Sequence, residues 1–195
     1  MKFIIATKNA HKVKEFARIL NPLGIETISQ VEAGINVDVE ENADTFEGNA
    51  RLKAKAIFEQ CGLPTIADDS GLEVFALNKA PGVYSARFGG EACKTDKDRY
   101  EKLLNDMKDI GEGQRDAQFV CCIYLVLSDN QEYSFIGTCK GTIGFQAVGE
   151  NGFGYDPIFM VGDKSFSQLS DTEKDTISHR GNALKQLETK LKEMK

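Results

Sequence analysis

Short apolar runs alternate with helically spaced apolar residues over the first part of the chain. The run KFIIAT at residues 2–7 predicts a buried strand. Residues 8–20 carry four apolar residues at helical spacing, which predicts a helix that buries this face: Val13, Phe16, Ala17 and Leu20. Pro22 and Gly24 then indicate the end of that helix.

The same alternation continues to about residue 70. GIETIS predicts a second strand, residues 30–44 are irregular and acidic, and residues 45–61 predict a second helix. LPTIADDSG predicts a third strand that ends in the adjacent acids Asp68 and Asp69, before a Ser-Gly turn. The order strand, helix, strand, helix, strand is typical of parallel pairing with right-handed crossovers.

The second half of the chain has a different pattern. Residues 117–145 contain two long β runs joined by the turn SDNQ, which predicts an antiparallel hairpin. Residues 94–110 and 178–195 each predict an amphipathic helix. The apolar residues expected on the buried face are Tyr100, Leu103, Leu104 and Met107 in the first, and Leu184, Leu187, Leu191 and Met194 in the second. We therefore expect an α/β fold with an elongated mixed β-sheet flanked by helices. We expect one domain, residues 1–195, with two lobes and a central cleft.

Composition narrows the class of protein. Hydrophobic residues make up 41% of the 195 residues and charged residues 28%, which is typical of a globular protein. A net charge of -6 argues against a general nucleic-acid or membrane surface, because either would favour a basic face. No apolar run is long enough for a membrane span or a signal peptide, so we expect a cytoplasmic protein. The five cysteines form no CxxC pair and are interpreted as reduced and structural.

In parallel α/β proteins, ligands bind beyond the carboxyl ends of the strands. Acidic residues are predicted to gather there. Asp68 and Asp69 stand at the predicted end of the third strand, and Glu40 and Glu41 stand before the second helix. Such a cluster is costly unless a cation neutralises it, and Mg²⁺ is typically held by one or two carboxylates plus substrate phosphates. One aspartate is therefore expected to hold a metal or activate water. Alternation on an extended segment allows only one of the two glutamates to face that metal.

Further polar segments indicate an anionic and aromatic ligand. TKNAHK, residues 7–12, opens the first helix, where free backbone N–H groups and Lys12 favour an anion. No Walker motif or GxGxxG is present. ENGFGYDPIF combines glycines with Phe153 and Tyr155, whose flat faces suit a base, and SHRG adds His179 and Arg180. Together these features suggest a nucleotide with metal-bound phosphates.

Several of these motifs resemble one known family. ATKNAHKVKEF, TFEGNARLKAKA, ADDSGLEVFALNKAPGVYSARF, AQFVC, GENGFGYDPIF and EKDTISHRGNAL are similar, in the same order, to the inosine triphosphatase/Ham1 (RdgB-like) family. The resemblance runs from residue 3 to about residue 187. It implies a Ham1/Maf-like fold and Mg²⁺-dependent hydrolysis of the purine nucleotides ITP, dITP and XTP. The products would be the monophosphate and pyrophosphate, which removes damaged purines from the nucleotide pool. It also implies a homodimer.

The resemblance also assigns site residues by position. Asp69 corresponds to the general base and a metal ligand, Glu41 to the other metal ligand, Lys53 to a phosphate-contacting lysine and Ser70 to a substrate contact. The phosphate loop corresponds to Thr7, Lys8, Asn9, Ala10, His11 and Lys12. The nucleoside-binding set corresponds to Phe153, Gly154, Tyr155, Asp156, Lys174, His179 and Arg180.

The chain departs from the family pattern at two positions. Gly48 stands where the family pattern T-F-x-E-N-A has glutamate, and Glu47 lies one residue out of phase, roughly 100° around the helix. Support for the metal from position 48 is therefore not expected. Lys8 replaces a glycine that many members carry, which we expect to be tolerated.

These assignments define a mechanism as a hypothesis. Mg²⁺ held by Glu41 and Asp69 would bridge the triphosphate, and water activated by Asp69 would attack the α-phosphorus while Lys12 and Lys53 neutralise charge. A donor from Arg180 or His179, or a backbone N–H, would pair with the oxygen at purine position 6 and so reject adenine.

Three alternatives are open at this point. The first is a Maf-like pyrophosphatase of pyrimidine or modified nucleotides, against which SHRG and GFGYDP speak. The second is a non-catalytic nucleotide-binding module whose acids only form a turn. The third is a structural or protein-interaction role, supported only by the expected dimer surface. No nucleic-acid polymer or membrane is expected as a partner.

Overall fold

The computed structural model describes residues 2–194, and these residues form a mixed seven-stranded sheet flanked by helices. This confirms the predicted α/β class. The strand order across the sheet is β2-β1-β3-β4-β5-β6-β7. The strands are β1 (Lys2–Ile5), β2 (Glu26–Ser29), β3 (Thr65–Val74), β4 (Asp116–Ser128), β5 (Gln131–Ile143), β6 (Phe159–Val161) and β7 (Lys164–Ser165). The helices are α1 (Ala10–Leu20), α2 (Phe46–Cys61), α3 (Asp96–Asp106), α4 (Asp171–Ile177) and α5 (His179–Glu193).

The first three strands are parallel, as the alternation of strands and helices predicts. β1 pairs with β2 from Lys2 opposite Glu26 onward, and it pairs with β3 at Ile4 opposite Thr65. Asn9 caps the first crossover helix and Thr45 caps the second. Each of these side chains accepts a hydrogen bond from a backbone N–H of the first helical turn, which is the usual role of an N-cap residue.

The predicted end of the third strand is wrong. β3 runs for ten residues to Val74, so Asp68 and Asp69 lie inside it and Ser70-Gly71 is extended rather than a turn. The apolar residues Leu72 and Val74 are fully buried, and their burial keeps the backbone in the sheet beyond the acids. The parallel neighbour β1 ends at Ile5, opposite Ile66. The two acids therefore lie just beyond the carboxyl end of that neighbour, although not at the end of their own strand.

The predicted hairpin is confirmed, since β4 and β5 are adjacent and only Asp129 and Asn130 separate them. Adjacent strands joined by so short a turn are necessarily antiparallel. The short strands β6 and β7 and the helix α4 were not predicted. A Ser170–Glu173 capping box starts α4, a signal that the sequence contains.

Two compact units make up the chain. Unit 1 comprises the residues up to Asp69, Cys121–Gly137 and the residues from His179 onward, and unit 2 comprises Ser70–Val120 and Thr138–Ser178. The expectation of one functional domain with two lobes stays a prediction.

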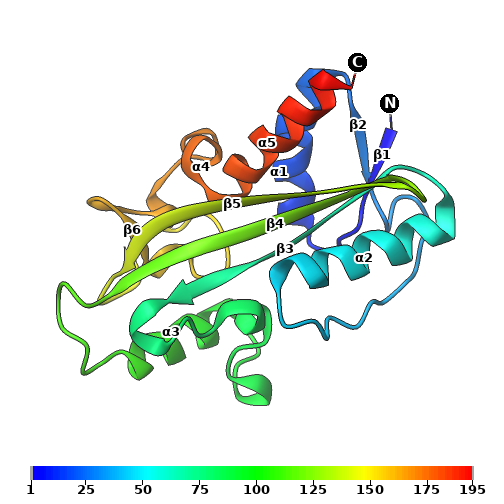
Figure 1. Ribbon diagram of the computed structural model, residues 1–195. Coiled ribbons are helices and arrows are strands. Elements are labelled where there is room, and N and C mark those ends of the chain that lie inside the picture. The colour runs from blue at the N-terminus through cyan, green and yellow to red at the C-terminus, as the bar shows by residue number, and fades with distance from the viewer. Residues whose placement is uncertain (1, 195) are drawn as a thin grey trace. The chain divides into compact units, whose positions relative to one another are not determined.

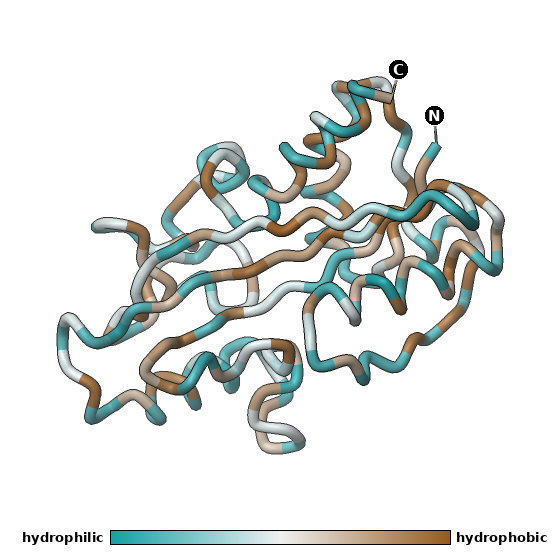
Figure 2. Tube along the Cα trace, in the orientation of Figure 1, coloured by the Kyte–Doolittle hydropathy of each residue, from teal (hydrophilic) through white to brown (hydrophobic). Residues whose placement is uncertain are grey.

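Unit 1 has helices on both faces of its strands (Figure 1). α1 and α5 cover one face, where a core cluster includes Phe16, Ile66 and Leu187. α2 covers the other face, where Ala50, Ile57 and Cys122 belong to a second cluster. Apolar colour follows the middle strands and alternates with polar colour along the helices in Figure 2, the pattern of elements that bury one face. Met194, expected to belong to the buried face of the last helix, is 41% exposed.

Unit 2 has its own aromatic core. Phe119 stacks on Phe166, with ring centroids 5.7 Å apart, and Phe159 packs edge-on against Phe166 at 4.9 Å. α3 contributes Leu103, and Met107 at its C-terminal end joins it; both are fully buried, as their helical spacing predicts.

Gly137 in β5 lies against α5 in unit 1. A Cβ at this position would lie 2.1 Å from the carbonyl oxygen of His179 and 2.4 Å from the backbone nitrogen of Ala183. Glycine therefore lets the first turn of α5 approach the strand at backbone distance. That turn carries Arg180, whose role is described below.

The cysteines and the helices agree with two further expectations. All five cysteines are free thiols, and all but the half-buried Cys61 are buried. Among residues 2–194, none of the helices combines the length and the apolar character that crossing a membrane requires.

Candidate functional site

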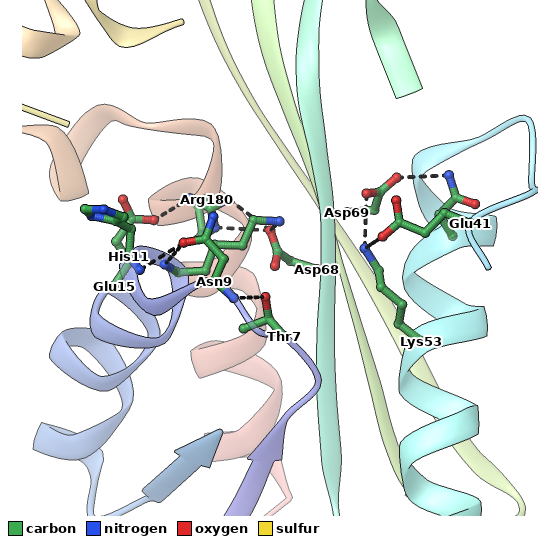
Figure 3. A network of polar contacts seen from close by, with 11 residues as sticks. Thr7, Asn9, His11, Glu15, Glu41, Lys53, Asp68, Asp69 and Arg180 are labelled. Atoms are coloured by element: carbon green, nitrogen blue, oxygen red, sulfur yellow. Dashed lines mark hydrogen bonds and ion pairs between the residues drawn. The ribbon is translucent and has the colours of Figure 1, made fainter. Parts of the chain in front are cut away.

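Asp68 and Asp69 extend to opposite sides of β3 (Figure 3). Successive side chains of a strand point to opposite faces, so two adjacent acids on an extended backbone cannot share one ligand position. Both residues are buried, with exposed fractions of 1% and 6%. The two carboxylates therefore have separate surroundings.

On the α1 and α5 side, Asp68 is surrounded by cations. Its Oδ2 lies 2.9 Å from the ammonium of Lys12 and accepts a 2.9 Å hydrogen bond from Nη2 of Arg180. The other terminal nitrogen of Arg180, Nη1, donates to Glu15. Burial raises the pKa of Asp68, but the charges of Lys12 and Arg180 lower it by more, so the pKa lies well below its usual range. Asp68 is therefore a fixed negative charge.

On the α2 side, Asp69 has one cation and one amide as partners. Its Oδ1 accepts from Nζ of Lys53 at 3.2 Å, and its Oδ2 accepts from Nδ2 of Asn49 at 3.2 Å. Lys53 also donates to Oε1 of Glu41 at 2.6 Å. Asn49 and Lys53 are four residues apart on α2 and so lie on one face of that helix.

The pKa of Asp69 shifts in the opposite direction to that of Asp68. Burial raises the pKa of Asp69 and the charge of Glu41 adds to the rise, while Lys53 opposes it without cancelling it. Burial lowers the pKa of Lys53, but the neighbouring carboxylates, Asp69 first, raise it by more. Lys53 thus stays an ammonium. Of the two adjacent aspartates, Asp69 accepts a proton more readily than Asp68.

The extended segment before α2 resolves which glutamate faces inward. Glu40 is exposed, whereas Glu41 is half-buried and contacts Lys53. The preceding residues Ile35, Val37 and Val39 are also half-buried and alternate with exposed polar ones. This alternation is visible in the sequence and could have selected Glu41.

Side-chain hydrogen bonds hold that segment in place. Nε2 of the buried Gln30 donates to the carbonyl of Val37 at 3.0 Å. Oδ1 of Asn49 accepts from the backbone nitrogen of Ala43 at 3.0 Å. Asn49 therefore ties the segment that carries Glu41 to the carboxylate of Asp69. Sequence reasoning did not include Asn49 in the site, although its spacing from Lys53 was a usable signal.

The loop before α1 is capped from within. The Asn9 side chain accepts from the backbone nitrogens of His11 at 2.9 Å and Lys12 at 3.4 Å, and Thr7 Oγ1 accepts from the nitrogen of Asn9 at 3.2 Å. The expected free N–H groups at this helix start are therefore partly satisfied, because asparagine is a strong N-cap. Ala10 and His11 are exposed, and Lys8 pairs with Asp38 at the surface at 3.1 Å.

A cavity of about 190 Å³ opens between this loop, the extended segment and α2. Its polar lining includes Thr7, Lys8, Asp38, Glu41 and Lys53. Pockets for drug-sized ligands measure about 300–1,000 Å³. The cavity is therefore of a size for the phosphate end of a nucleotide rather than for the whole molecule.

The predicted nucleoside residues of unit 2 form a second cluster. Asp156 Oδ2 accepts from Nζ of Lys174 at 2.6 Å and from the backbone nitrogen of Phe153 at 2.8 Å. The ammonium of Lys174 lies 4.9 Å from the centre of the Phe153 ring. The backbone nitrogen of Gly154 donates to Asp96 Oδ2 at 2.8 Å. These contacts fix the ring of Phe153, which is half-buried.

Three other predicted residues have distinct settings. Tyr155 is only 5% exposed, and its hydroxyl donates to the carbonyl of Ser85 at 2.8 Å, so its ring is part of the unit 2 core. Ser70 is half-buried and follows Asp69 in β3. His179 is buried at the start of α5 in unit 1.

Gly48 has a steric reason in this chain. A Cβ at position 48 would lie 2.6 Å from the Cβ of Ala43, so the segment that carries Glu41 packs directly on the helix. Glu47, the neighbouring acid, is exposed.

Across residues 2–194, the structure contains no group of three or more His, Cys, Asp or Glu side chains that could hold a metal ion alone.

The chain is similar to known proteins over nearly its full length. The profile of the Ham1 family matches residues 3–190. A relative named dITP/XTP pyrophosphatase from Haemophilus influenzae is 47% identical over 194 residues, which cover 97% of this chain and 98% of the relative. A relative of the same name from Exiguobacterium sibiricum is 45% identical, with 98% and 97% covered.

Solved structures agree with the sequence relatives. The Staphylococcus aureus Ham1 protein matches with a TM-score of 0.88 and 45% identity over 100% of both chains. A HAM1 protein from Coxiella burnetii matches with a TM-score of 0.89 and 41% identity over 99% of both chains. With a family match across most of its length and relatives of this identity, the chain belongs to the Ham1 family.

Proposed function

We propose that this protein hydrolyses non-standard purine nucleoside triphosphates, dITP, XTP and ITP, to the monophosphate and pyrophosphate. The observation that carries the proposal is the similarity to relatives named dITP/XTP pyrophosphatase, at about 45% identity over nearly the whole chain. The enzyme is a hydrolase that acts on the anhydride between the α- and β-phosphates.

Asp69 is proposed as the general base. Its carboxylate is held by Lys53 and Asn49, and burial raises its pKa, which favours acceptance of a proton. The water oxygen forms a bond to the α-phosphorus while the bond from that phosphorus to the bridging oxygen breaks. The proton of the water passes to Asp69, and pyrophosphate leaves with the electron pair of the broken bond.

The phosphate chain is proposed to enter the cavity beside Lys53. The ammonium of Lys53 and the side chains of Thr7 and Lys8 line that cavity and supply positive charge and hydrogen-bond donors. Lys12 pairs with Asp68. The Asp68 carboxylate lies on the other side of β3 from Asp69 (Figure 3). The prediction that Lys12 contacts the same phosphate chain is kept as a proposal.

The residues present fit a hard divalent cation. Glu41 and Asp69 offer carboxylate oxygens on either side of one ammonium, and Mg²⁺ is commonly held by one or two carboxylates completed by substrate phosphates. We propose Mg²⁺, with Glu41 and Asp69 as its protein ligands. The chemistry it supplies when bound is neutralisation of the negative charge on the phosphate oxygens.

The purine is proposed to contact Phe153 and Lys174, with Gly154, Tyr155 and Asp156 shaping that segment and Ser70, His179 and Arg180 also contacting substrate. A donor to the oxygen at position 6 would distinguish inosine and xanthosine from adenosine nucleotides. Arg180 already donates to Asp68 and Glu15, so it would have to exchange a partner to act as that donor.

The direct test is pyrophosphate release from dITP, XTP and ITP against dGTP, dATP and dUTP, with and without Mg²⁺. Release from the first three alone, dependent on Mg²⁺, is the expected result. Turnover of pyrimidine nucleotides instead would support a Maf-like pyrophosphatase. Nucleotide binding without any pyrophosphate release would support a non-catalytic module.

The homodimer is kept as a proposal, and light scattering at several protein concentrations tests it.

A further inference from the structure

The ammonium of Lys53 lies where two carboxylates converge. It is 2.6 Å from Oε1 of Glu41 and 3.2 Å from Oδ1 of Asp69, and the three side chains come from an extended segment, a helix and a strand (Figure 3). The lysine side chain is only 14% exposed. A positive side chain thus neutralises the same two acids that the proposed function assigns to a divalent cation.

A metal ion and this ammonium compete for those oxygens. Mg²⁺ requires oxygen ligands at about 2.0–2.1 Å, and an N–H donor on the same oxygens takes up one lone pair of each and adds like charge. Asn49 holds the second oxygen of Asp69 at 3.2 Å, so the oxygen that faces Glu41 is the one that Lys53 occupies. A cation that bridges these two oxygens therefore has to compete with the ammonium of Lys53.

Lys53 also has a place to go. Its four-carbon side chain is flexible and carries a compact charge, unlike the planar fork of arginine. It lines the cavity of about 190 Å³ together with Thr7 and Lys8, to which we assign the phosphate chain. Phosphate oxygens in that cavity would offer the ammonium new acceptors in place of the carboxylates.

We infer that Lys53 is an exchangeable internal counter-ion: it blocks the divalent-cation position in the ligand-free protein and moves to the phosphates when substrate binds. Cation and polyphosphate binding are then coupled, because each favours the same position of Lys53, and such coupling is reciprocal. The inference rests on the proposed function for the identity of the anion. The competition between Lys53 and the cation is a property of the free protein and can be measured without nucleotide.

The test is Mn²⁺ binding to nucleotide-free protein, followed by electron paramagnetic resonance of the unbound ion. Lys53→Met removes the competitor, so we expect the affinity for Mn²⁺ to rise by about tenfold or more. In the wild type, Mn²⁺ binds only the fraction of molecules in which Lys53 has left the two acids, and its apparent affinity is reduced by that fraction. Lys53→Arg keeps the charge and is expected to bind Mn²⁺ no more tightly than the wild type. Lys55→Met is the matched control, because Lys55 pairs with Glu132 instead and its loss should leave the affinity unchanged.

Unchanged or weaker binding of Mn²⁺ by Lys53→Met would overturn the inference, as would an equal gain in Lys55→Met, which would indicate a general charge effect. If Lys53→Met does not fold, the wild type itself decides. In protein labelled with ¹⁵N-lysine, addition of Mg²⁺ should shift the Lys53 ammonium resonance, assigned by its absence in Lys53→Arg, and not that of Lys55. Saturation with Mg²⁺ without that shift contradicts the inference. Failure of the proposed function has another signature, the lack of pyrophosphate release from every nucleotide.

Discussion

The two sides of β3 show how adjacent residues of one type acquire different chemistry. Asp68 faces Lys12 and Arg180 and has a lowered pKa, while Asp69 faces Lys53 and Asn49 and has a raised pKa. Both are buried, so desolvation alone does not explain why their pKa values shift in opposite directions. The difference comes from the charges around each carboxylate, since Asp68 contacts two cations and Asp69 contacts one. One side holds a permanent charge that organises the fold, and the other holds a carboxylate that can accept a proton or a metal.

The largest expected effect is on catalysis at Asp69. Asp69→Asn keeps the shape and one acceptor oxygen for the donors Lys53 and Asn49 but removes the base, so kcat should fall by about 10²–10⁴-fold, the usual contribution of a general base. The melting temperature should stay close to that of the wild type. Pyrophosphate release from dITP and thermal unfolding measure the two quantities. Near-normal turnover in this variant would remove Asp69 from the mechanism.

Asp68→Asn should instead act on stability. It leaves the buried Arg180 and the half-buried Lys12 without their shared carboxylate, and breaking a buried ion pair in this way costs about 3–5 kcal/mol. Urea unfolding followed by circular dichroism gives the free energy of unfolding. A matched change at the surface, Asp38→Asn, removes only the exposed pair with Lys8 and should cost no more than about 1 kcal/mol. Equal losses in both variants would contradict the assigned role of Asp68.

Asn49 connects the reactive side to its supporting loop and should have a smaller effect. Asn49→Ala removes the donor to Asp69 and the acceptor for Ala43, and loss of such an orienting partner typically costs about 10–100-fold in activity or metal affinity. Asn49→Ser is a comparison that keeps a shorter polar group and should recover part of the loss. Steady-state kinetics with dITP over a range of Mg²⁺ concentrations measures both. An unchanged kcat/KM in Asn49→Ala would show that Asp69 needs no such support.

The smallest effect is a difference in how stability depends on pH. The pKa of Asp68 is lowered from 3.8, so its contribution is present above pH 3.8 and declines as pH falls below that value. The pKa of Asp69 is raised from 3.8, so its charged form disfavours folding, and this penalty disappears as pH falls through its folded pKa. In metal-free buffer, the stability difference between wild type and Asp68→Asn should shrink in acid, and that for Asp69→Asn should have the opposite sign. Differences of one sign for both variants would contradict the assigned pKa shifts.

Much of the fold was predictable because periodicity is local. The apolar spacing of α1, the Thr45 cap of α2 and the two-residue turn between β4 and β5 each appear within a few residues of sequence. The end of β3 was not, because the Ser-Gly pair looks like a turn until the burial of Leu72 and Val74 is known. Tertiary burial overrides local turn preference there.

The site was partly predictable from the family resemblance. The resemblance assigned Lys53, Glu41 and Asp69 by position, and the structure brings these three side chains into contact. The partner of Arg180, Glu15, could not be found, since a pair 165 residues apart leaves no local signal. The separation of Asp68 from Asp69 depended on knowing that the backbone is extended at both.

Gly137 contacts neither aspartate, but it affects the Asp68 side of β3. Any side chain there would collide with the backbone of His179 and Ala183, and backbone atoms in a packed helix cannot give way as a flexible side chain can. The whole first turn of α5 would shift, and Arg180 would shift with it, away from Asp68. A substitution at this glycine would thus reduce the amount of folded enzyme and would also displace His179 and Arg180, which the proposed function assigns to substrate.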